Sequence, residues 1–215
     1  MYTPEAFGES DPVVMADLVR RHPLGLLVVS GPAGLQAAPV PFLHREQAGA
    51  HQLLAHVARA NPLWRELHEA PDCLVVFQGA AAYVTPSWYP SKANTHKVVP
   101  TWNYETVQLR GKATVIHDTQ WLRQQVGWVT AHLEQQRAQP WQVSDAPADF
   151  IESQLRALVG IQISVSSWQG KWKMSQNRSS EDAQGVVQGL SDPADPHANA
   201  AVATEVAARL AARLR

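Results

Sequence analysis

Short apolar runs recur along the sequence, each long enough for one β-strand and too short for a long buried helix. Turn-forming residues separate them, and Gly31-Pro32-Ala33-Gly34 is typical of a hairpin turn. Aliphatic residues in Val159–Trp168 alternate with small or polar ones, which indicates a strand with one buried face. We expect strands over Leu24–Ser30, Leu35–Phe42, His51–Ala58, Cys73–Gln78, Ala81–Thr85, Val107–His117 and Val159–Trp168, with a sharp turn at Gly79.

Helical patterns interrupt this series without producing regular βαβ units. Asp11 and Asn61 are suitable N-cap residues for two of the helices. The expected helices cover residues 11–22, Asn61–Leu67, Thr119–Gln139, Asp149–Leu158 and Asn199–Leu214. The pattern predicts a mainly β protein with peripheral helices (α+β), built as an antiparallel barrel or sandwich. We expect one domain over residues 1–190, then a linker and C-terminal helix over 191–215 that packs on the domain or a dimer.

Composition excludes several classes of protein. The 215 residues carry a net charge of −1, so no general field draws the chain toward nucleic acid or anionic lipid. The single cysteine, Cys73, lies in an apolar run, and we expect it to be buried rather than a nucleophile. Apolar runs fall far short of the roughly 20 residues that a membrane helix needs, and the N-terminus lacks a signal peptide pattern. We therefore expect a soluble cytoplasmic protein.

Familiar catalytic motifs are missing. The nine histidines show no metal-binding spacing, so we expect no metal site. Gly-x-Gly-x-x-Gly, the phosphate-binding P-loop and Gly-x-Ser-x-Gly do not occur.

Two segments, Lys97–Tyr104 and Lys171–Arg178, mix cations, small polar side chains and large aromatic rings. Such a mixture suits a site that holds an anion at one end and a flat heteroaromatic ring at the other. Tyr83–Tyr89 adds aromatic residues in a stretch with irregular backbone, and His56–Pro62 places Arg59 where a strand meets a helix N-terminus. Each segment alone also fits a packed or solvated surface, but together they favour a site for a phosphorylated planar ligand.

These motifs resemble those of the PaiB family over essentially the whole chain. The resemblance is carried by Met1–Phe7, Ala55–Pro62, Ala82–Tyr89, Val99-Pro100-Thr101-Trp102-Asn103-Tyr104 and Gly170–Arg178. PaiB proteins are bacterial FMN-binding negative transcriptional regulators. The resemblance implies an FMN-binding antiparallel split β-barrel that forms a homodimer, with each FMN held in a cleft between subunits.

The resemblance also implies which residues bind FMN. Arg59 and Lys97 would bind the phosphate, while Trp88, Tyr89 and Trp102 would enclose the ring. Residues from Lys173 to Arg178 would complete the site, in one interpretation from the partner subunit. The full set is His56, Val57, Ala58, Arg59, Asn61, Trp88, Tyr89, Lys97, Val99, Pro100, Thr101, Trp102, Asn103, Lys173, Gln176, Asn177 and Arg178.

Three functions remain open at this point. A regulatory FMN-binding protein would act on transcription through DNA or a regulatory protein partner. An NAD(P)H-dependent flavin reductase or oxidoreductase would need acid–base groups, for which Tyr104, His56 and His96 are candidates. A barrel that binds another planar anionic ligand, such as haem or a deazaflavin, is the third; His56 is the nearest candidate for an axial ligand of haem, and no strong axial-ligand signature is present. The sequence assigns no catalytic residue and leaves open whether the protein is an enzyme.

Overall fold

The computed structural model describes residues 1–32 and 34–213. Leu214, expected at the end of the last helix, lies outside the described residues. The strands are β1 (Gly8–Glu9), β2 (Leu24–Gly31), β3 (Gly34–Pro41), β4 (Leu43–Gln47), β5 (Ala50–Ala58), β6 (Asp72–Val84), β7 (Thr101–Ile116) and β8 (Leu158–Lys173). The helices are η1 (Glu5–Phe7), α1 (Pro12–Arg21), α2 (Leu63–Glu69), η2 (Pro86–Trp88), α3 (Ser91–Thr95), α4 (Thr119–Glu134), η3 (Val143–Asp145), α5 (Ala148–Arg156), α6 (Ser180–Ser191) and α7 (Ala200–Arg213).

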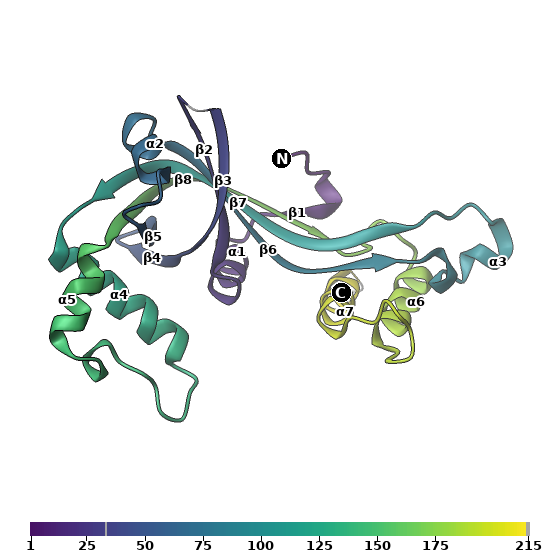
Figure 1. The fold of residues 1–215 in the computed structure, drawn as a ribbon. Coiled ribbons are helices and arrows are strands. Elements are labelled where there is room, and N and C mark those ends of the chain that lie inside the picture. The colour runs from purple at the N-terminus through teal and green to yellow at the C-terminus, as the bar shows by residue number, and fades with distance from the viewer. Residues whose placement is uncertain (33, 214–215) are drawn as a thin grey trace. The chain divides into compact units, whose positions relative to one another are not determined.

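One sheet contains all eight strands, in the order β3-β2-β6-β7-β8-β5-β4, with β1 paired to β8 (Figure 1). Ladders β2–β3, β2–β6, β4–β5, β5–β8 and β1–β8 are antiparallel. Among the described residues no ladder joins β3 to β4, so the sheet is open. The mainly β, antiparallel class with peripheral helices is therefore confirmed.

The chain forms two compact units, and β6, β7 and β8 contribute residues to both. The first unit consists of the described residues of Met1–Met15, Gln78–Val107 and Gln169–Arg215. The second unit consists of the described residues of Ala16–Phe77 and Gln108–Trp168. This division does not test the expected boundary near residue 190, which stays a prediction.

In the second unit, α4 and α5 pack together and α4 covers part of the sheet (Figure 1). Val129 of α4 packs with Leu43 and Leu54 of β4 and β5. Asp118 caps the helix, since its carboxylate accepts a hydrogen bond from the Trp121 amide at 2.6 Å. The helix ends at Glu134 rather than at Gln139 as expected, because the following polar residues are exposed and offer no apolar face for packing.

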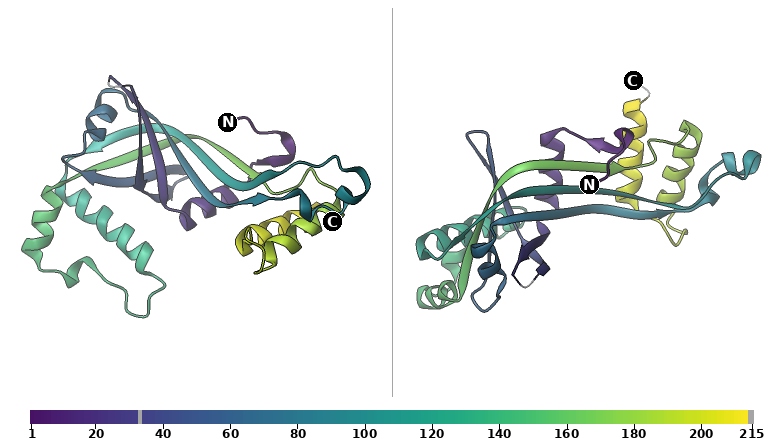
Figure 2. Two further views of the ribbon diagram at one scale, coloured as in Figure 1. Left: turned by 45° about the vertical axis from the view of Figure 1, so that its right-hand side comes forward. Right: turned by 90° about the horizontal axis from the view of Figure 1, so that it is seen from above.

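In the first unit, α6 and α7 lie side by side in every view (Figures 1 and 2). The sequence interpretation missed α6, although Ser179 caps it by accepting a hydrogen bond from the Asp182 amide at 3.2 Å. Gly189 lets the helix approach Trp88, whose ring would lie 2.3 Å from a Cβ atom at that position. The approach of Trp88 thus depends on a glycine in the helix.

The Gly79 turn and the bounds of two long strands were predicted wrongly, and one short strand was missed. Gly79 lies inside the continuous strand β6 and not in a turn. Its missing side chain makes room for Glu105, whose Oε1 accepts a hydrogen bond from the Ala80 amide at 3.2 Å. Residues 101–104 belong to β7 and residues 171–173 to β8, so β7 begins before Val107, β8 continues beyond Trp168, and part of each mixed segment is strand. Strand β4 was missed because its second half is polar and exposed.

Cys73 is buried, as predicted, and burial raises the pKa of its thiol to about 12. Within residues 1–32 and 34–213, none of the helices has the length and apolarity required to cross a membrane. The same residues bring no group of three or more His, Cys, Asp or Glu to metal-binding distance.

Candidate functional site

In the first unit, the beginning of β7 lies beside the end of β8. Lys173 of β8 donates hydrogen bonds to the Thr101 hydroxyl and to the Trp102 carbonyl. Asn103 is fully buried and donates from Nδ2 to the Ser175 hydroxyl at 2.9 Å. We call Thr101, Trp102, Asn103, Lys173 and Ser175 the strand-end cluster. It joins residues of Lys97–Tyr104 and Lys171–Arg178, the two mixed segments that the sequence predicted to act together.

The turn after β8 is built by its own side chains. Ser175 has a positive φ of 63°, and it is buried. Gln176 accepts a hydrogen bond from the Met174 amide and donates one to the Trp172 carbonyl, both at 2.6 Å. Arg178 follows, with its amide donating to the Ser175 carbonyl at 3.0 Å. Gln176 therefore shapes the turn that presents Lys173 and Arg178.

The cluster has an excess of positive charge. Burial lowers the pKa of Lys173, and the nearby charges of Lys171 and Arg178 lower it further. Lys171 donates to the Tyr2 carbonyl at 3.1 Å and lies 5.4 Å from the centre of the Tyr104 ring. An anion bound here would stabilise the charged form of Lys173.

Aromatic residues of the first unit differ in how much of their surface is available. Trp102 is 57% exposed and meets Tyr83 edge-on at 6.1 Å. Trp88 packs on α6 and donates to the Asp195 carboxylate at 3.1 Å. Tyr89 is buried under the Arg178 guanidinium at 4.6 Å, and burial raises its pKa while Arg178 opposes the rise. Trp102 thus has the most accessible surface of the predicted aromatic residues.

The remaining predicted residues of this unit lie on exposed segments. Lys97, Val99, Pro100 and Asn177 are all exposed. The Lys97 amide donates to the Thr95 hydroxyl at 3.3 Å, directly after His96, which adopts a left-handed conformation. These residues precede the strand-end cluster in the sequence or continue its turn, and their role at FMN stays a prediction.

In the second unit, His56 of β5 and Gln125 of α4 form a close pair. His56 Nδ1 lies 2.7 Å from Gln125 Oε1. Gln125 is 1% exposed, and its Nε2 has no hydrogen-bond partner among the described residues. Val57 is buried, and Ala58 is exposed beside it. Sequence reasoning found His56 but missed Gln125, because a polar residue within a helical pattern normally faces solvent.

Arg59 connects β5 to the end of α5. Its guanidinium donates to the Arg156 carbonyl at 2.9 Å and to the Leu158 carbonyl at 2.7 Å. This places a cation at the C-terminal end of a helix dipole, which is a stabilising arrangement. Asn61 lies just before α2, whose N-cap is Pro62 rather than Asn61 as expected, and its side chain accepts a hydrogen bond from the Leu63 amide at 3.0 Å. Arg59 and Asn61, both predicted FMN ligands, therefore also make hydrogen bonds within the protein. The other N–H groups of the Arg59 guanidinium could bind a phosphate.

The groups present fit the chemistry of FMN. The phosphate of FMN requires cations, which Lys173 and Arg178 provide in the first unit and Arg59 in the second. The imide edge of the flavin ring offers both donors and acceptors. Two buried atoms, Asn103 Oδ1 and Gln125 Nε2, lack hydrogen-bond partners among the described residues, and unpaired buried polar atoms are uncommon outside functional sites. Trp102 supplies an accessible flat ring.

Comparison with proteins of known sequence identifies relatives in bacteria and fungi. "Protease synthase and sporulation protein PAI 2" of Bacillus subtilis is 30% identical over 198 residues, covering 92% of this chain and 93% of the relative. An uncharacterized protein of Aspergillus fumigatus is 32% identical over 236 residues, covering 88% of this chain and 90% of the relative. The fungal relatives weaken the implication of a bacterial source.

Solved structures confirm the fold. The FAD- and haem-binding protein of Mycobacterium smegmatis has a TM-score of 0.58 at 17% identity, with 77% of this chain and 73% of that one covered. The flavocytochrome Anf3 of Azotobacter vinelandii has a TM-score of 0.56 at 18% identity, with 77% and 69% covered. At such low identity the likeness concerns the split-barrel fold alone.

The family described as "Putative FMN-binding domain" matches residues 1–167, which include the second unit up to the residue before Trp168 and most strands of the first. This match and the similarity to the Bacillus subtilis relative support the predicted resemblance to PaiB. Between the cofactors considered from the sequence, they favour FMN over haem or a deazaflavin. The chain belongs to this family of FMN-binding domains, and its cofactor is FMN.

Proposed function

We propose that this protein is an FMN-dependent regulator that works as a homodimer. The observation that carries the proposal is the strand-end cluster, where Lys173 lies beside two further cations and the buried Asn103 Oδ1 has no partner among the described residues. FMN supplies a redox-active ring when it is bound. Changes in FMN occupancy or redox state would then be the signal that the protein transmits.

In the proposed dimer, residues of the first unit of one protomer and of the second unit of its partner bind FMN. Lys173, Arg178 and Lys97 supply positive charge in the first unit, and Arg59 supplies it in the second. Trp102 would stack on the ring, since most of its surface is exposed. The other predicted residues act by shaping these contacts, as Gln176 shapes its turn and Asn61 accepts a hydrogen bond from the first residue of α2.

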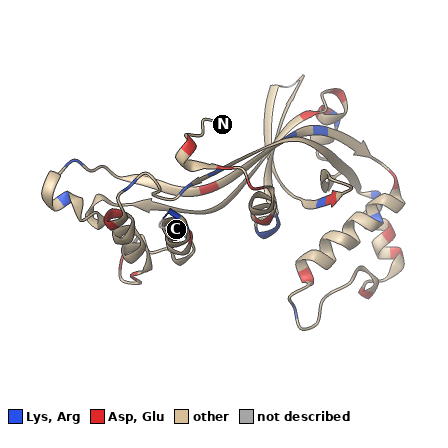
Figure 3. Ribbon diagram, turned by 180° about the vertical axis from the view of Figure 1, so that it is seen from behind, with Lys and Arg blue, Asp and Glu red and all other residues tan. Residues whose placement is uncertain are grey.

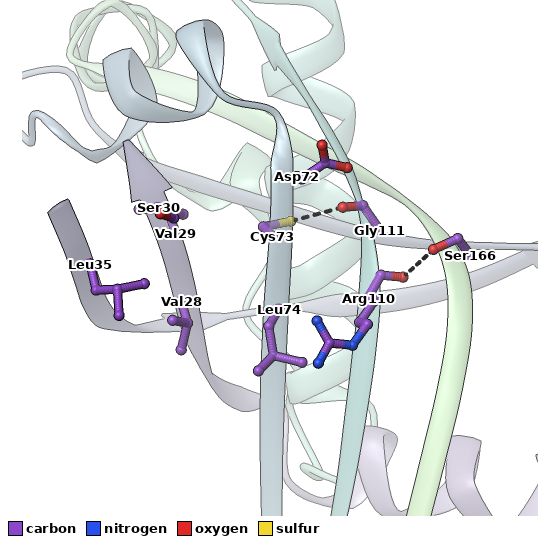
Figure 4. A pocket seen from close by; sticks show the side chains of 10 residues that line it. All are labelled: Val28, Val29, Ser30, Leu35, Asp72, Cys73, Leu74, Arg110, Gly111 and Ser166. Atoms are coloured by element: carbon purple, nitrogen blue, oxygen red, sulfur yellow. Dashed lines mark hydrogen bonds between the residues drawn. The ribbon is translucent and has the colours of Figure 1, made fainter. Parts of the chain in front are cut away.

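The proposed dimer uses an exposed apolar face of the sheet in the second unit. Leu24 and Leu26 of β2 and Leu35 of β3 are 63%, 42% and 79% exposed. Leu35, Val28 and Leu74 line an open pocket of about 510 Å³ in this unit, toward which Figure 4 shows Arg110 extending beside Leu74. Exposed apolar patches of this kind are typical of interaction sites.

Charge complementarity favours a second copy of the chain as the partner for this face. Asp72 and Arg110 both line the pocket, from neighbouring strands β6 and β7. A twofold axis brings the same patch of two protomers together, so Asp72 of one protomer could pair with Arg110 of the other. The homodimer proposed from the family resemblance is consistent with this arrangement.

Direct DNA binding is the less favoured route to regulation. Lys and Arg are interspersed with Asp and Glu in the described part of the chain, without one long cationic stripe (Figure 3). DNA-binding proteins normally neutralise several phosphates, which makes their affinity fall steeply with salt. We therefore expect a protein partner.

Selection from a random duplex pool, followed by anisotropy titration at several salt concentrations, tests whether the protein binds DNA directly. Specific, salt-sensitive binding would contradict the expectation of a protein partner.

A second candidate function is an NAD(P)H-dependent flavin oxidoreductase. The observation in its favour is His56, which is half-buried, oriented by Gln125 and able to exchange a proton. Mixing the FMN-loaded protein with NADH or NADPH without oxygen separates the two functions. Rapid loss of the oxidised flavin absorbance would favour the oxidoreductase, and an unchanged spectrum would favour the regulator.

Affinity measurements test the proposed site directly. Lys173→Met should weaken FMN binding by roughly 10- to 100-fold, because a hydrogen bond to a charged group contributes about 1.5–3 kcal/mol. Lys112→Met is the matched control, because Lys112 is an exposed lysine of β7 in the second unit and is not a predicted FMN ligand. Equal affinities for both variants, measured by quenching of flavin fluorescence, would remove the strand-end cluster from the site.

A further inference from the structure

The contact between Gln125 and His56 has a chemical consequence that the sequence motifs do not contain. We infer that Gln125 is a positioning residue that holds His56 in the tautomer with hydrogen on Nδ1, so that Nε2 accepts a hydrogen bond from an N–H group of bound FMN. The inference rests on the proposed function, in which His56 lies at the FMN site. It assigns a specific role to a residue of α4 that no sequence motif identified.

Gln125 is held in place by the helix and by what surrounds it. Asp118 fixes the first turn of α4, and Trp121 lies one turn before Gln125 on the same face. Trp121 packs in both apolar clusters of this unit. Its ring also fills the space over Gly160, where a Cβ atom would lie 2.4 Å away. The side chain of Gln125 is therefore buried beside a fixed ring.

His56 is held from the other side by the sheet. It is paired with Gly160 in the antiparallel ladder between β5 and β8. Because Gly160 has no side chain, the Trp121 ring can approach β8 at the position that pairs with His56. The imidazole is half-buried, and its Nδ1 lies 2.7 Å from Gln125 Oε1. Strand and helix together leave the ring a narrow range of orientations.

The hydrogen bond determines the tautomer. An amide oxygen can only accept, so His56 Nδ1 must donate to Gln125 Oε1. A neutral imidazole carries one ring hydrogen, and Nε2 is consequently an acceptor. A neutral acceptor selects an N–H donor on the ligand, and the imide edge of the flavin ring carries one.

An unpaired atom supports a functional rather than a structural origin for the pair. Gln125 Nε2 is buried and has no partner among the described residues. Leaving a buried donor unpaired costs about 1–3 kcal/mol, and such groups concentrate at functional sites. An apolar residue at this position would avoid that cost but would leave His56 without its acceptor. The glutamine is therefore explained by what it does to His56.

Two charge-matched variants test the inference. Gln125→Glu replaces the amide with a carboxylate, which favours the doubly protonated ring and turns Nε2 into a donor. Gln124→Glu makes the same charge change at the preceding, exposed residue of α4, which does not contact His56. We expect Gln125→Glu to weaken the binding of oxidised FMN about tenfold or more, and Gln124→Glu to stay within about twofold of the unmodified protein.

A second measurement does not depend on FMN. Nitrogen-15 chemical shifts of the histidines in the FMN-free protein, assigned with His56→Asn, report which ring nitrogen carries hydrogen. The Nδ1–H tautomer in the unmodified protein and a doubly protonated ring in Gln125→Glu at pH 7 would support the inference. The Nε2–H tautomer, or equal FMN affinities for the two glutamate variants, would overturn it. If the unmodified protein bound no FMN, the proposed function would fail instead, and the nitrogen shifts would still decide the tautomer.

Discussion

At the scale of residues, the sequence predicted the types of side chain at the candidate site better than their arrangement. Lys173, Thr101 and Trp102 were expected to act together, and they share hydrogen bonds. Gln125 could not be predicted, because its contact with His56 joins residues far apart in the chain. Trp88 was expected to enclose the flavin, but its packing on α6 depends on glycines of a helix that the sequence interpretation missed. Its role at FMN stays a prediction.

Cys73 should be unreactive in the folded protein. Burial raises its pKa to about 12, with the charge of Asp72 adding to the rise. At pH 8 only about one thiol in 10,000 would then be ionised, and the thiolate is the reactive form. We expect no labelling by an aromatic disulfide reagent in native buffer and complete labelling in denaturant. Stoichiometric labelling of the native protein within minutes would contradict a buried thiol.

His44 should make stability depend on pH. Burial lowers its pKa from the ordinary value of 6.5 to about 4, and the charges of His51 and Arg20 lower it further while Glu46 opposes them. Its ring also touches His51, at 3.1 Å between ring nitrogens, and the edge of Trp168. Between pH 6.5 and pH 4 the unfolded chain binds a proton at His44 that the folded chain does not bind. The contribution of this group to stability is therefore fully present above pH 6.5 and is lost as the pH falls toward 4.

The matched variants for this effect are His44→Gln and His68→Gln. The first should reduce the loss of unfolding free energy between pH 7 and pH 4.5, measured with denaturant. The second changes an exposed histidine and should leave the pH profile as it was. If His44→Gln kept the full slope, another group would be responsible for it.

At the scale of elements, periodicity predicted most of the strands and helices that bury one face, although it missed α6. The first part of β8 was found from its alternation, and α1 from its cap and flanking proline. The Gly79 turn was wrong because a glycine that accommodates the side chain of Glu105 has the same sequence signal as a turn glycine. Local sequence does not contain that distinction, since Glu105 belongs to another strand.

Two glycines of the second unit should respond oppositely to alanine. In Gly160→Ala the new Cβ atom would overlap the Trp121 ring at 2.4 Å, which should destabilise the protein by about 1–3 kcal/mol. Gly127 lies inside α4 with nothing within 4 Å of its Cβ position, so Gly127→Ala should stabilise by up to about 1 kcal/mol. Thermal and denaturant unfolding would measure both. A neutral Gly160→Ala would mean that Trp121 does not pack there.

At the scale of the whole molecule, we expect a dimer that forms through the exposed apolar face of the sheet in the second unit. Leu26→Lys puts a charge in the middle of that face and should give a monomer by light scattering. Leu133→Lys changes another exposed leucine, in α4 and outside the face, and should remain dimeric. A dimeric Leu26→Lys protein would place the interface elsewhere. The sequence could not identify this face, because the sequence of a strand does not show which of its leucines are exposed and which are buried.

We propose that FMN is bound by a site to which two protomers contribute, one through Arg59 and the other through Lys173. Mixing Arg59→Gln with Lys173→Met, each unable to bind FMN tightly, tests it most directly. Random exchange makes half of the dimers mixed, and one of the two sites in each mixed dimer is then unaltered. An FMN titration of the mixture should recover tight binding at about a quarter of the sites. No recovery above the two separate variants, with exchange verified by mass, would contradict the shared site.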